Sequence, residues 1–172
     1  NRDFDSEDLL AFELGYRATP LDALALDLSG FYNRYTDLRT VEPGTPFPID
    51  CPPAPFGTCT ATPSTAANNA DADAWGLEAS ATWQAASFWR LTLGYSWIDV
   101  DVDPDANSLD PTAINAEGDM PHHQVQLLSR LDLPFGVELD SSLYWVDEVS
   151  NQRVDDYFRL DERRAWRPWK GR

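Results

Sequence analysis

The chain has 172 residues, of which 29 are acidic and 13 are basic, so its formal net charge at pH 7 is −16. This acidity argues against nucleic-acid binding, which needs a basic surface, and favours the attraction of cations. The sequence contains no continuous apolar run long enough for a transmembrane helix. These properties leave two possibilities, a soluble domain with its own core or a set of strands with one apolar and one polar face.

The first predicted hairpin covers residues 9–32. Apolar and polar side chains alternate along 9–18 and again along 24–32, as they do in strands whose two faces have different surroundings. Thr19 and Pro20 are predicted to form the tight connection between the two arms. Because the chain begins at Asn1 without a basic and apolar leader, we expect it to be an internal fragment of a longer protein.

A first long loop is predicted at about residues 42–73, which are rich in Pro, Ala, Thr and Asn and show no periodicity. This segment contains both cysteines of the chain, Cys51 and Cys59. Their spacing fits a local disulfide, which would place the segment in an oxidising compartment, and the alternative is a pair of free thiols. A zinc site is not expected, because no second pair of Cys or His stands at zinc spacing.

The second predicted hairpin joins residues 74–84 to 88–103 through a short turn at 85–87. Its second arm has the longest alternation in the chain. A strand that crosses a membrane needs about ten residues, with aromatic rings at both interfaces. The aromatic residues that we expect at such interfaces are Trp75, Trp83, Trp89, Tyr95, Trp97 and Trp145. The alternative is that they pack in the core of a soluble sheet.

A second long loop is predicted at about residues 104–121, followed by a third hairpin whose tight turn is Pro134–Gly136. A seventh strand is predicted at residues 157–166. The regular exchange of tight turns and long loops is typical of bacterial outer-membrane barrels, which have short periplasmic turns and longer extracellular loops. On the polar side of these strands we expect Glu78, Arg90, Arg130 and Asp132, which would pair across strands or touch a segment inside the barrel.

Six segments of the chain resemble the carboxy-terminal barrel region of TonB-dependent outer-membrane receptors. They are EDLLAFELGYR (7–17), LSGFYNRYTDLRT (28–40), WGLEASATW (75–83), FWRLTLGYSWIDVDV (88–102), PHHQVQLLSRLDLPFGVELD (121–140) and VDDYFRLDERRAWRP (154–168). The resemblance implies a 22-stranded barrel closed by a plug domain, in the outer membrane of a Gram-negative bacterium. It also implies uptake of a ferric siderophore, cobalamin or another scarce ligand, with energy supplied by TonB through the plug.

We therefore expect an all-β fold, an antiparallel up-and-down segment of about seven strands within the larger barrel. Residues 1–172 would supply barrel wall and surface loops without the plug, and would contact outer-membrane lipid and lipopolysaccharide. Because specificity in such barrels lies at the exposed mouth, the expected ligand contacts are Phe47, Asp50, Phe56, Asp105, Asn107, Asp110 and Asn115. The alternatives are a soluble acidic β-sandwich that binds carbohydrate or protein, and a passive porin-like channel without a plug.

The last predicted strand departs from the family pattern. Glu162 and Arg164 stand where the alternation from Leu160 predicts lipid-facing apolar residues. An arginine at the bilayer midplane costs about 2 to 4 kcal/mol. The sequence therefore predicts either a bulge that shifts the register or an end of the strand that is not embedded.

No pattern in the chain predicts catalysis, a cofactor or a metal site. The alternating acids Asp99, Asp101, Asp103 and Asp105 resemble the opening of a calcium loop, but Pro104 and Asp110 occupy the positions where an EF-hand requires Gly and Glu. We interpret them as a solvated strand extension, with divalent-cation binding shared with lipopolysaccharide as the alternative. His122 and His123 are adjacent on a strand and point to opposite faces, so they are not expected to chelate one ion. A nucleophile elbow and a phosphate-binding glycine loop are also absent from the sequence.

Overall fold

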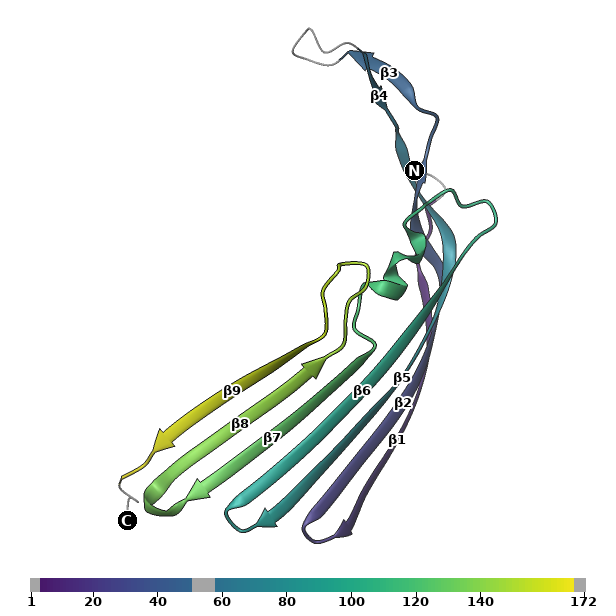
Figure 1. The fold of residues 1–172 in the computed structure, drawn as a ribbon. Coiled ribbons are helices and arrows are strands. Elements are labelled where there is room, and N and C mark those ends of the chain that lie inside the picture. The colour runs from purple at the N-terminus through teal and green to yellow at the C-terminus, as the bar shows by residue number, and fades with distance from the viewer. Residues whose placement is uncertain (1–3, 51–57, 169–172) are drawn as a thin grey trace.

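The computed structural model describes residues 4–50 and 58–168, which form almost entirely β-structure (Figure 1). Within these residues the strands are β1 (Asp8–Leu21), β2 (Leu24–Pro43), β3 (Phe47–Asp50), β4 (Thr58–Ala61), β5 (Ser64–Ala86), β6 (Trp89–Pro104), β7 (His123–Leu133), β8 (Val137–Val146) and β9 (Tyr157–Trp166). Two short 3-10 segments, η1 (Ala113–Gly118) and η2 (Pro134–Gly136), lie in the connections around β7. In this part of the chain no helix combines the length and the apolar character that a membrane crossing needs.

Seven strands form one antiparallel sheet in the order β1-β2-β5-β6-β7-β8-β9, which confirms the up-and-down arrangement of about seven strands. The sheet is open, with β1 and β9 at its edges, so the described residues do not close a barrel. The remaining two strands, β3 and β4, pair as a separate hairpin beyond the far ends of β2 and β5 (Figure 1). The described residues thus form a curved sheet with one projecting hairpin (Figure 1).

The tight turns lie together at one end of the sheet (Figure 1). The turn predicted at Thr19 and Pro20 is wrong, because β1 continues through Leu21 with an irregular register after Ala18. Proline lacks the N–H of a ladder hydrogen bond and is tolerated here because the regular pairing with β2 is interrupted between Ala18 and Leu21. The second turn is 87–88, so Phe88 precedes the strand instead of starting it. The third turn is Pro134–Gly136 as predicted.

The first long connection is mostly strand, so the irregular loop predicted for residues 42–73 is wrong in its local structure. β2 and β5 continue their ladder as far as the pair Pro43 and Ser64, past register irregularities around Leu38. We call this outer part of β2 and β5, residues 36–43 and 64–73, the ribbon. Residues 64–69 of the ribbon are small or polar and show no hydrophobic alternation, so only the backbone pairing reveals them as strand, whereas buried Ala and partly exposed Asp alternate along 70–73.

The second long connection, from the end of β6 at Pro104 to the start of β7 at His123, agrees with the predicted loop at 104–121 and contains η1. A third connection, residues 147–156, joins β8 to β9 at the same end of the sheet. The seventh strand of the sheet, β9, has the predicted bounds. The long connections therefore all lie opposite the tight turns, which is the predicted asymmetry.

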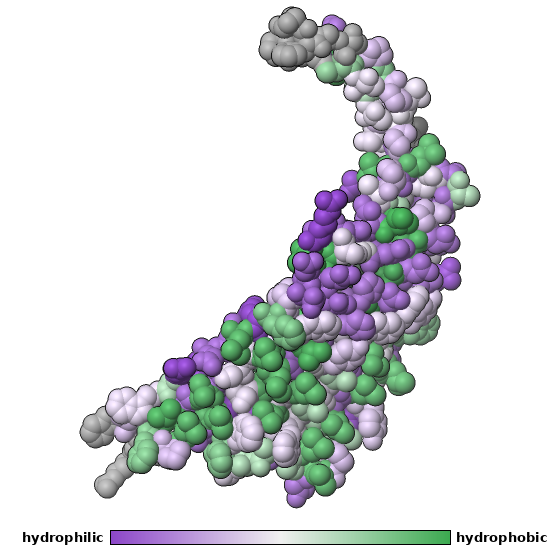
Figure 2. Space-filling view, viewed as in Figure 1, coloured by the Kyte–Doolittle hydropathy of each residue, from purple (hydrophilic) through white to green (hydrophobic). Residues whose placement is uncertain are grey.

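The register gives the sheet one apolar and one polar face, because directly paired residues of antiparallel strands share a face. The row that crosses β5 to β9 on the apolar face is Ala81, Leu93, Leu127, Leu143 and Leu160. The neighbouring row on the polar face contains Ser80, Gly94, Gln126 and Tyr144. Toward the tight-turn end hydrophobic side chains gather at the surface, while hydrophilic ones cover the region below the projecting hairpin (Figure 2).

The sheet is a single layer, which does not fit the alternative of a β-sandwich. Among the described residues, the buried apolar side chains are Ala70, Ala72, Ala74 and Val102, all outside the central rows. Leu14 on the apolar face is 81% exposed and Leu93 is 49% exposed. A soluble sandwich would cover such a face with a second sheet.

The pairing of β9 removes one of the two explanations for its charges. The register between β8 and β9 is unbroken from Val146 and Tyr157 to Val137 and Trp166, so a bulge does not shift it. Glu162 and Arg164 therefore lie on the apolar face, where they form an ion pair with an N to O distance of 2.9 Å. They stand four and two residues before the tight-turn end of β9, where a long side chain can reach an interface.

Candidate functional site

Six aromatic residues form two bands on the apolar face. Register places Trp83 and Trp89 near the tight turns, and the other four, Trp75, Tyr95, Trp97 and Trp145, toward the long connections. Trp89 and Trp97 are eight residues apart on β6, or about 27 Å of strand. At a tilt of about 40° this spans roughly 20 Å, which is close to the apolar band of about 25 Å in outer-membrane barrels.

Three of these six rings have a hydrogen-bond partner for their polar atom. Trp89 donates its Nε1–H to the Oγ of Ser129 at 3.0 Å, and Trp145 donates its Nε1–H to Asp156 at 3.1 Å. The hydroxyl of Tyr95 lies 2.9 Å from Nδ1 of His123. Apolar rings with a hydrogen-bonded polar atom are typical of membrane interfaces, so the geometry fits the predicted interface role.

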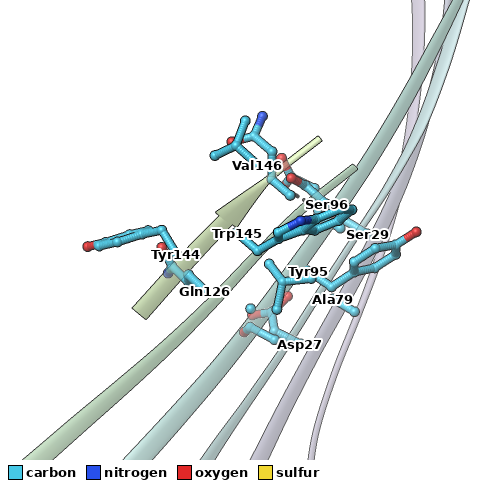
Figure 3. Close-up of a pocket in the computed structure, with 14 residues that line it drawn as sticks. Asp27, Ser29, Ala79, Tyr95, Ser96, Gln126, Tyr144, Trp145 and Val146 are labelled. Carbon is cyan, nitrogen blue, oxygen red and sulfur yellow. Dashed lines mark hydrogen bonds between the residues drawn. The ribbon is translucent and has the colours of Figure 1, made fainter. Parts of the chain in front are cut away.

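A pocket of about 310 Å³ opens on the polar face, where Gly94 leaves room between strands β2 and β8 (Figure 3). Polar residues from several strands line it together with apolar surface, and Asp27, Glu78 and Gln126 are among them. A Cβ at Gly94 would lie 3.1 Å from Cγ of Gln126, so a larger residue would fill the hollow. Glu78 accepts a hydrogen bond from Ser29 at 3.5 Å, and Asp27 accepts one from Arg17 at 2.6 Å. Asp27 is ion-paired with Arg17, and Glu78 has no cationic partner among the described residues, so this pocket carries a negative charge and can hold a polar group.

The predicted ligand residues of the second long connection differ in their exposure and in their hydrogen bonds. Asp105 and Asn107 are exposed, with side chains open to solvent. Asp110 instead anchors the connection, because its Oδ2 accepts the backbone N–H of Val41 at 2.7 Å and its Oδ1 accepts the N–H and hydroxyl of Thr112. These hydrogen bonds, above all that from Val41, hold the pKa of Asp110 below its usual value.

Glu42 at the end of β2 is a second anchor, which the sequence did not reveal. Its carboxylate accepts the backbone N–H of Leu109 at 2.6 Å, the hydroxyl of Ser108 at 2.9 Å and the side-chain N–H of Asn69 at 3.0 Å. The bond from the Leu109 backbone is the main reason why the pKa of Glu42 falls from 4.5 to about 2. An acid in a proline-rich segment has no pattern that would have predicted this role.

A third carboxylate completes the attachment. Glu117 in η1 accepts the backbone N–H of Val102 at 3.0 Å. Ala70, Ala72 and Val102 form the buried cluster beside η1, and their register positions belong to the polar face. We call residues 105–122 the anchored loop, since Glu42, Asp110 and Glu117 fix it to the ribbon and to β6.

Asn115 joins the anchored loop to the next connection. Its carbonyl oxygen accepts a hydrogen bond from the side chain of Asn151 at 2.6 Å, while its own side chain is exposed. The backbone N–H of Asn151 also donates to the carbonyl of Gly118 at 3.1 Å. Two of the long connections are therefore held together by hydrogen bonds.

The other predicted ligand residues lie on the projecting hairpin. Phe47 and Asp50, in β3, are exposed, whereas Phe56 lies outside the described residues. The structure thus separates the candidates into a group on the anchored loop and a group on the hairpin. Cys59 is in β4 and Cys51 lies outside the described residues, so their pairing stays a prediction.

The acids after Trp97 continue the apolar face beyond the upper aromatic band. Asp101 and Asp103 pair directly with Asp73 and Asp71 of β5. Asp99 lies 3.4 Å from Nδ1 of His122, and His123, on the neighbouring position, contacts Tyr95 instead. No group of three or more His, Cys, Asp or Glu side chains within 4–50 and 58–168 is arranged to hold a metal ion.

Comparison with known proteins gives one family match. The family described as "TonB dependent receptor-like, beta-barrel" matches residues 1–170, which is almost the whole chain. No curated protein matches the sequence.

Proposed function

Because the chain belongs to the TonB-dependent receptor β-barrel family, we propose that it forms wall and surface loops of a receptor that takes up a ferric siderophore. Members of this family are outer-membrane receptors and transporters of Gram-negative bacteria, and they are not enzymes. The seven-stranded sheet would be one section of a 22-stranded barrel around a plug, which receives energy from TonB.

One observation carries the membrane part of the proposal. The apolar face of the sheet is uncovered and bounded by two bands of aromatic residues about 20 Å apart. Exposing such a face to water costs roughly 25 cal/mol for each Å² of apolar surface, whereas contact with hydrocarbon does not carry this cost. The polar face then lines the inside of the barrel.

The loop chemistry supports a neutral or positively charged ferric complex. The exposed candidates offer carboxylate and amide groups at Asp105, Asn107 and Asn115, with the apolar ring of Phe47 on the hairpin. The chain carries a net charge of −16, so an anionic complex would meet repulsion on its approach. A ligand with hydrogen-bonding groups and no net negative charge suits this surface best.

Iron uptake by cells that make the intact receptor tests this function. We expect uptake of ⁵⁵Fe from neutral or cationic ferric siderophores, and we expect it to stop when an uncoupler collapses the proton gradient. The double variant Asp105→Asn and Asn107→Ala should raise the half-saturating concentration, while Asp22→Asn at the tight-turn end should not. Uptake that survives the uncoupler would instead indicate a passive channel, and transport of cobalamin alone would reject the siderophore.

A further inference from the structure

Three arginines lie in one cross-strand row on the polar face, near the tight-turn end. The register pairs Arg90 with Arg130, Arg130 with Asp140, and Asp140 with Arg163. Gln84 of β5 completes the row beside Arg90. The pocket at Gly94 is acidic, so the polar face changes sign along the strands.

Arg90 and Arg130 are direct neighbours of like charge, an arrangement that is unfavourable without a counter-ion. Arg90 donates its Nε–H to Oε1 of Gln84 at 2.9 Å, which fixes the stem of the side chain and leaves the end of the guanidinium available. Arg130 has no hydrogen bond or ion pair to any residue within 4–50 and 58–168. Both side chains are exposed.

The carboxylates nearby are engaged elsewhere. Asp140 binds Arg163 at 2.8 Å, and Glu138 binds Arg167 at 2.9 Å. Asp132, two residues after Arg130, forms no ion pair with Arg90 or Arg130 in the described part of the chain. Pairs at this spacing do form on β9, where Arg164 holds Glu162 at 2.9 Å, so the spacing itself is not the obstacle.

A pocket of about 210 Å³ lies between the two arginines. Thr82 and Thr92 line it with hydroxyl groups 3.2 Å apart, and Leu128 supplies the remaining wall. The planar guanidinium group matches the two oxygens of a carboxylate and can bind it with two parallel hydrogen bonds. Two such groups across one small pocket could hold a carboxylate from both sides.

We propose that Arg90 and Arg130 form a carboxylate-binding site on the inner wall of the barrel. The carboxylate comes either from an acidic side chain of a protein segment inside the barrel or from a small carboxylic acid in the lumen. The first source rests on the proposed function, because it requires a segment that fills the barrel. The second source requires only an open polar face.

Carbodiimide coupling of the intact receptor, purified from outer membranes, tests the site. The reagent condenses a lysine amine with a carboxylate in contact with it, and digestion with mass spectrometry then identifies both partners. The Arg130→Lys variant is treated with and without citrate. Arg163→Lys is the matched control, in which we expect an amide with Asp140.

We expect the lysine at position 130 to couple to an acid outside residues 1–172, or to give a citrate adduct when citrate is present. The first result identifies a protein source and the second a small-molecule source. In the double variant Arg90→Gln and Arg130→Lys this coupling should fall severalfold. Coupling of position 130 to Asp132 or Asp140 would overturn the proposal, as would the absence of coupling in both arms while the control reacts. The citrate arm does not depend on iron uptake, so it separates failure of the site from failure of the proposed function.

Discussion

Because the two faces of the sheet differ, we expect arginine at two neighbouring positions of β7 to have very different effects on the free energy of unfolding. Leu127 belongs to the aliphatic row on the apolar face, and Gln126 points to the polar face beside Gly94. The substitutions Leu127→Arg and Gln126→Arg thus introduce the same side chain at nearly the same depth. Only the face of the sheet differs.

The depth of Leu127 sets the expected cost. Its row lies four residues from the row of Trp89 and four from the row of Trp97, or about 13 Å of strand in each direction. With a strand tilt of about 40°, this places Leu127 roughly 10 Å from either aromatic band, near the bilayer midplane. Arginine there should cost about 2 to 4 kcal/mol, which lowers the folding equilibrium constant roughly 30- to 800-fold. On the polar face the cost should stay within about 0.5 kcal/mol.

Urea titration of the intact protein in phospholipid vesicles measures this difference through tryptophan fluorescence. The folded and unfolded forms can be checked independently by the gel shift of unheated samples. We expect Leu127→Arg to shift the unfolding midpoint to lower urea, and Gln126→Arg to leave it near that of the unmodified protein. If Gln126→Arg proved as costly as Leu127→Arg, the assignment of the apolar face to lipid would be wrong.

Three further predictions concern the anchored loop and the close packing of the sheet. Glu42→Gln replaces an accepting oxygen by a donor, so hydrogen exchange at the Leu109 amide should become roughly tenfold faster. Because folding lowers the pKa of Glu42 from 4.5 to about 2, its carboxylate should protect the loop fully above pH 4.5 and lose this effect as the pH falls toward 2. Exchange measured between pH 2 and 6 should show this dependence in the unmodified protein and lack it in Glu42→Gln. Gly76→Ala should destabilise the sheet by about 1 to 3 kcal/mol in the same urea titration, because the new Cβ would lie 2.8 Å from the carbonyl oxygen of Trp97. Gly15→Ala is the control and should be neutral, because the atom nearest to its Cβ is 3.9 Å away.

The seven-stranded sheet was predictable because apolar and polar side chains alternate along most of its strands. β9 has the predicted bounds, and the turn at Pro134–Gly136 has the predicted place. In that turn Phe135 and Gly136 have positive φ angles of 63° and 75°, and a Cβ at Gly136 would overlap the carbonyl oxygen of Arg167. A Pro-X-Gly sequence between two alternating segments is a turn signal with a clear physical basis.

The ribbon and the loop anchors were not predictable for the opposite reason. Residues 64–69 have small or polar side chains and are not part of the buried cluster, so their pairing with β2 leaves no alternating pattern in the sequence. Glu42 and Asp110 are far apart in the chain, and each accepts the backbone N–H of a residue 67 or 69 positions away. Such long-range contacts are specified by the assembled fold and by no local pattern.

The anchors also divide the predicted ligand residues into those whose side chains are free to bind a ligand and those whose side chains already hold the loop in place. A ligand that bound the carboxylate of Asp110 would have to displace the N–H of Val41, and would thereby remove one of the hydrogen bonds that attach the loop to the ribbon. The exposed side chains of Asp105, Asn107 and Asn115 make no such attachment to the described residues and can bind without this penalty. Substitution at Asp110 should therefore impair uptake through the position of the whole loop, and substitution at Asn107 through the loss of a single contact. Measuring loop proteolysis together with ligand affinity distinguishes the two, because only the Asp110 variant should change both.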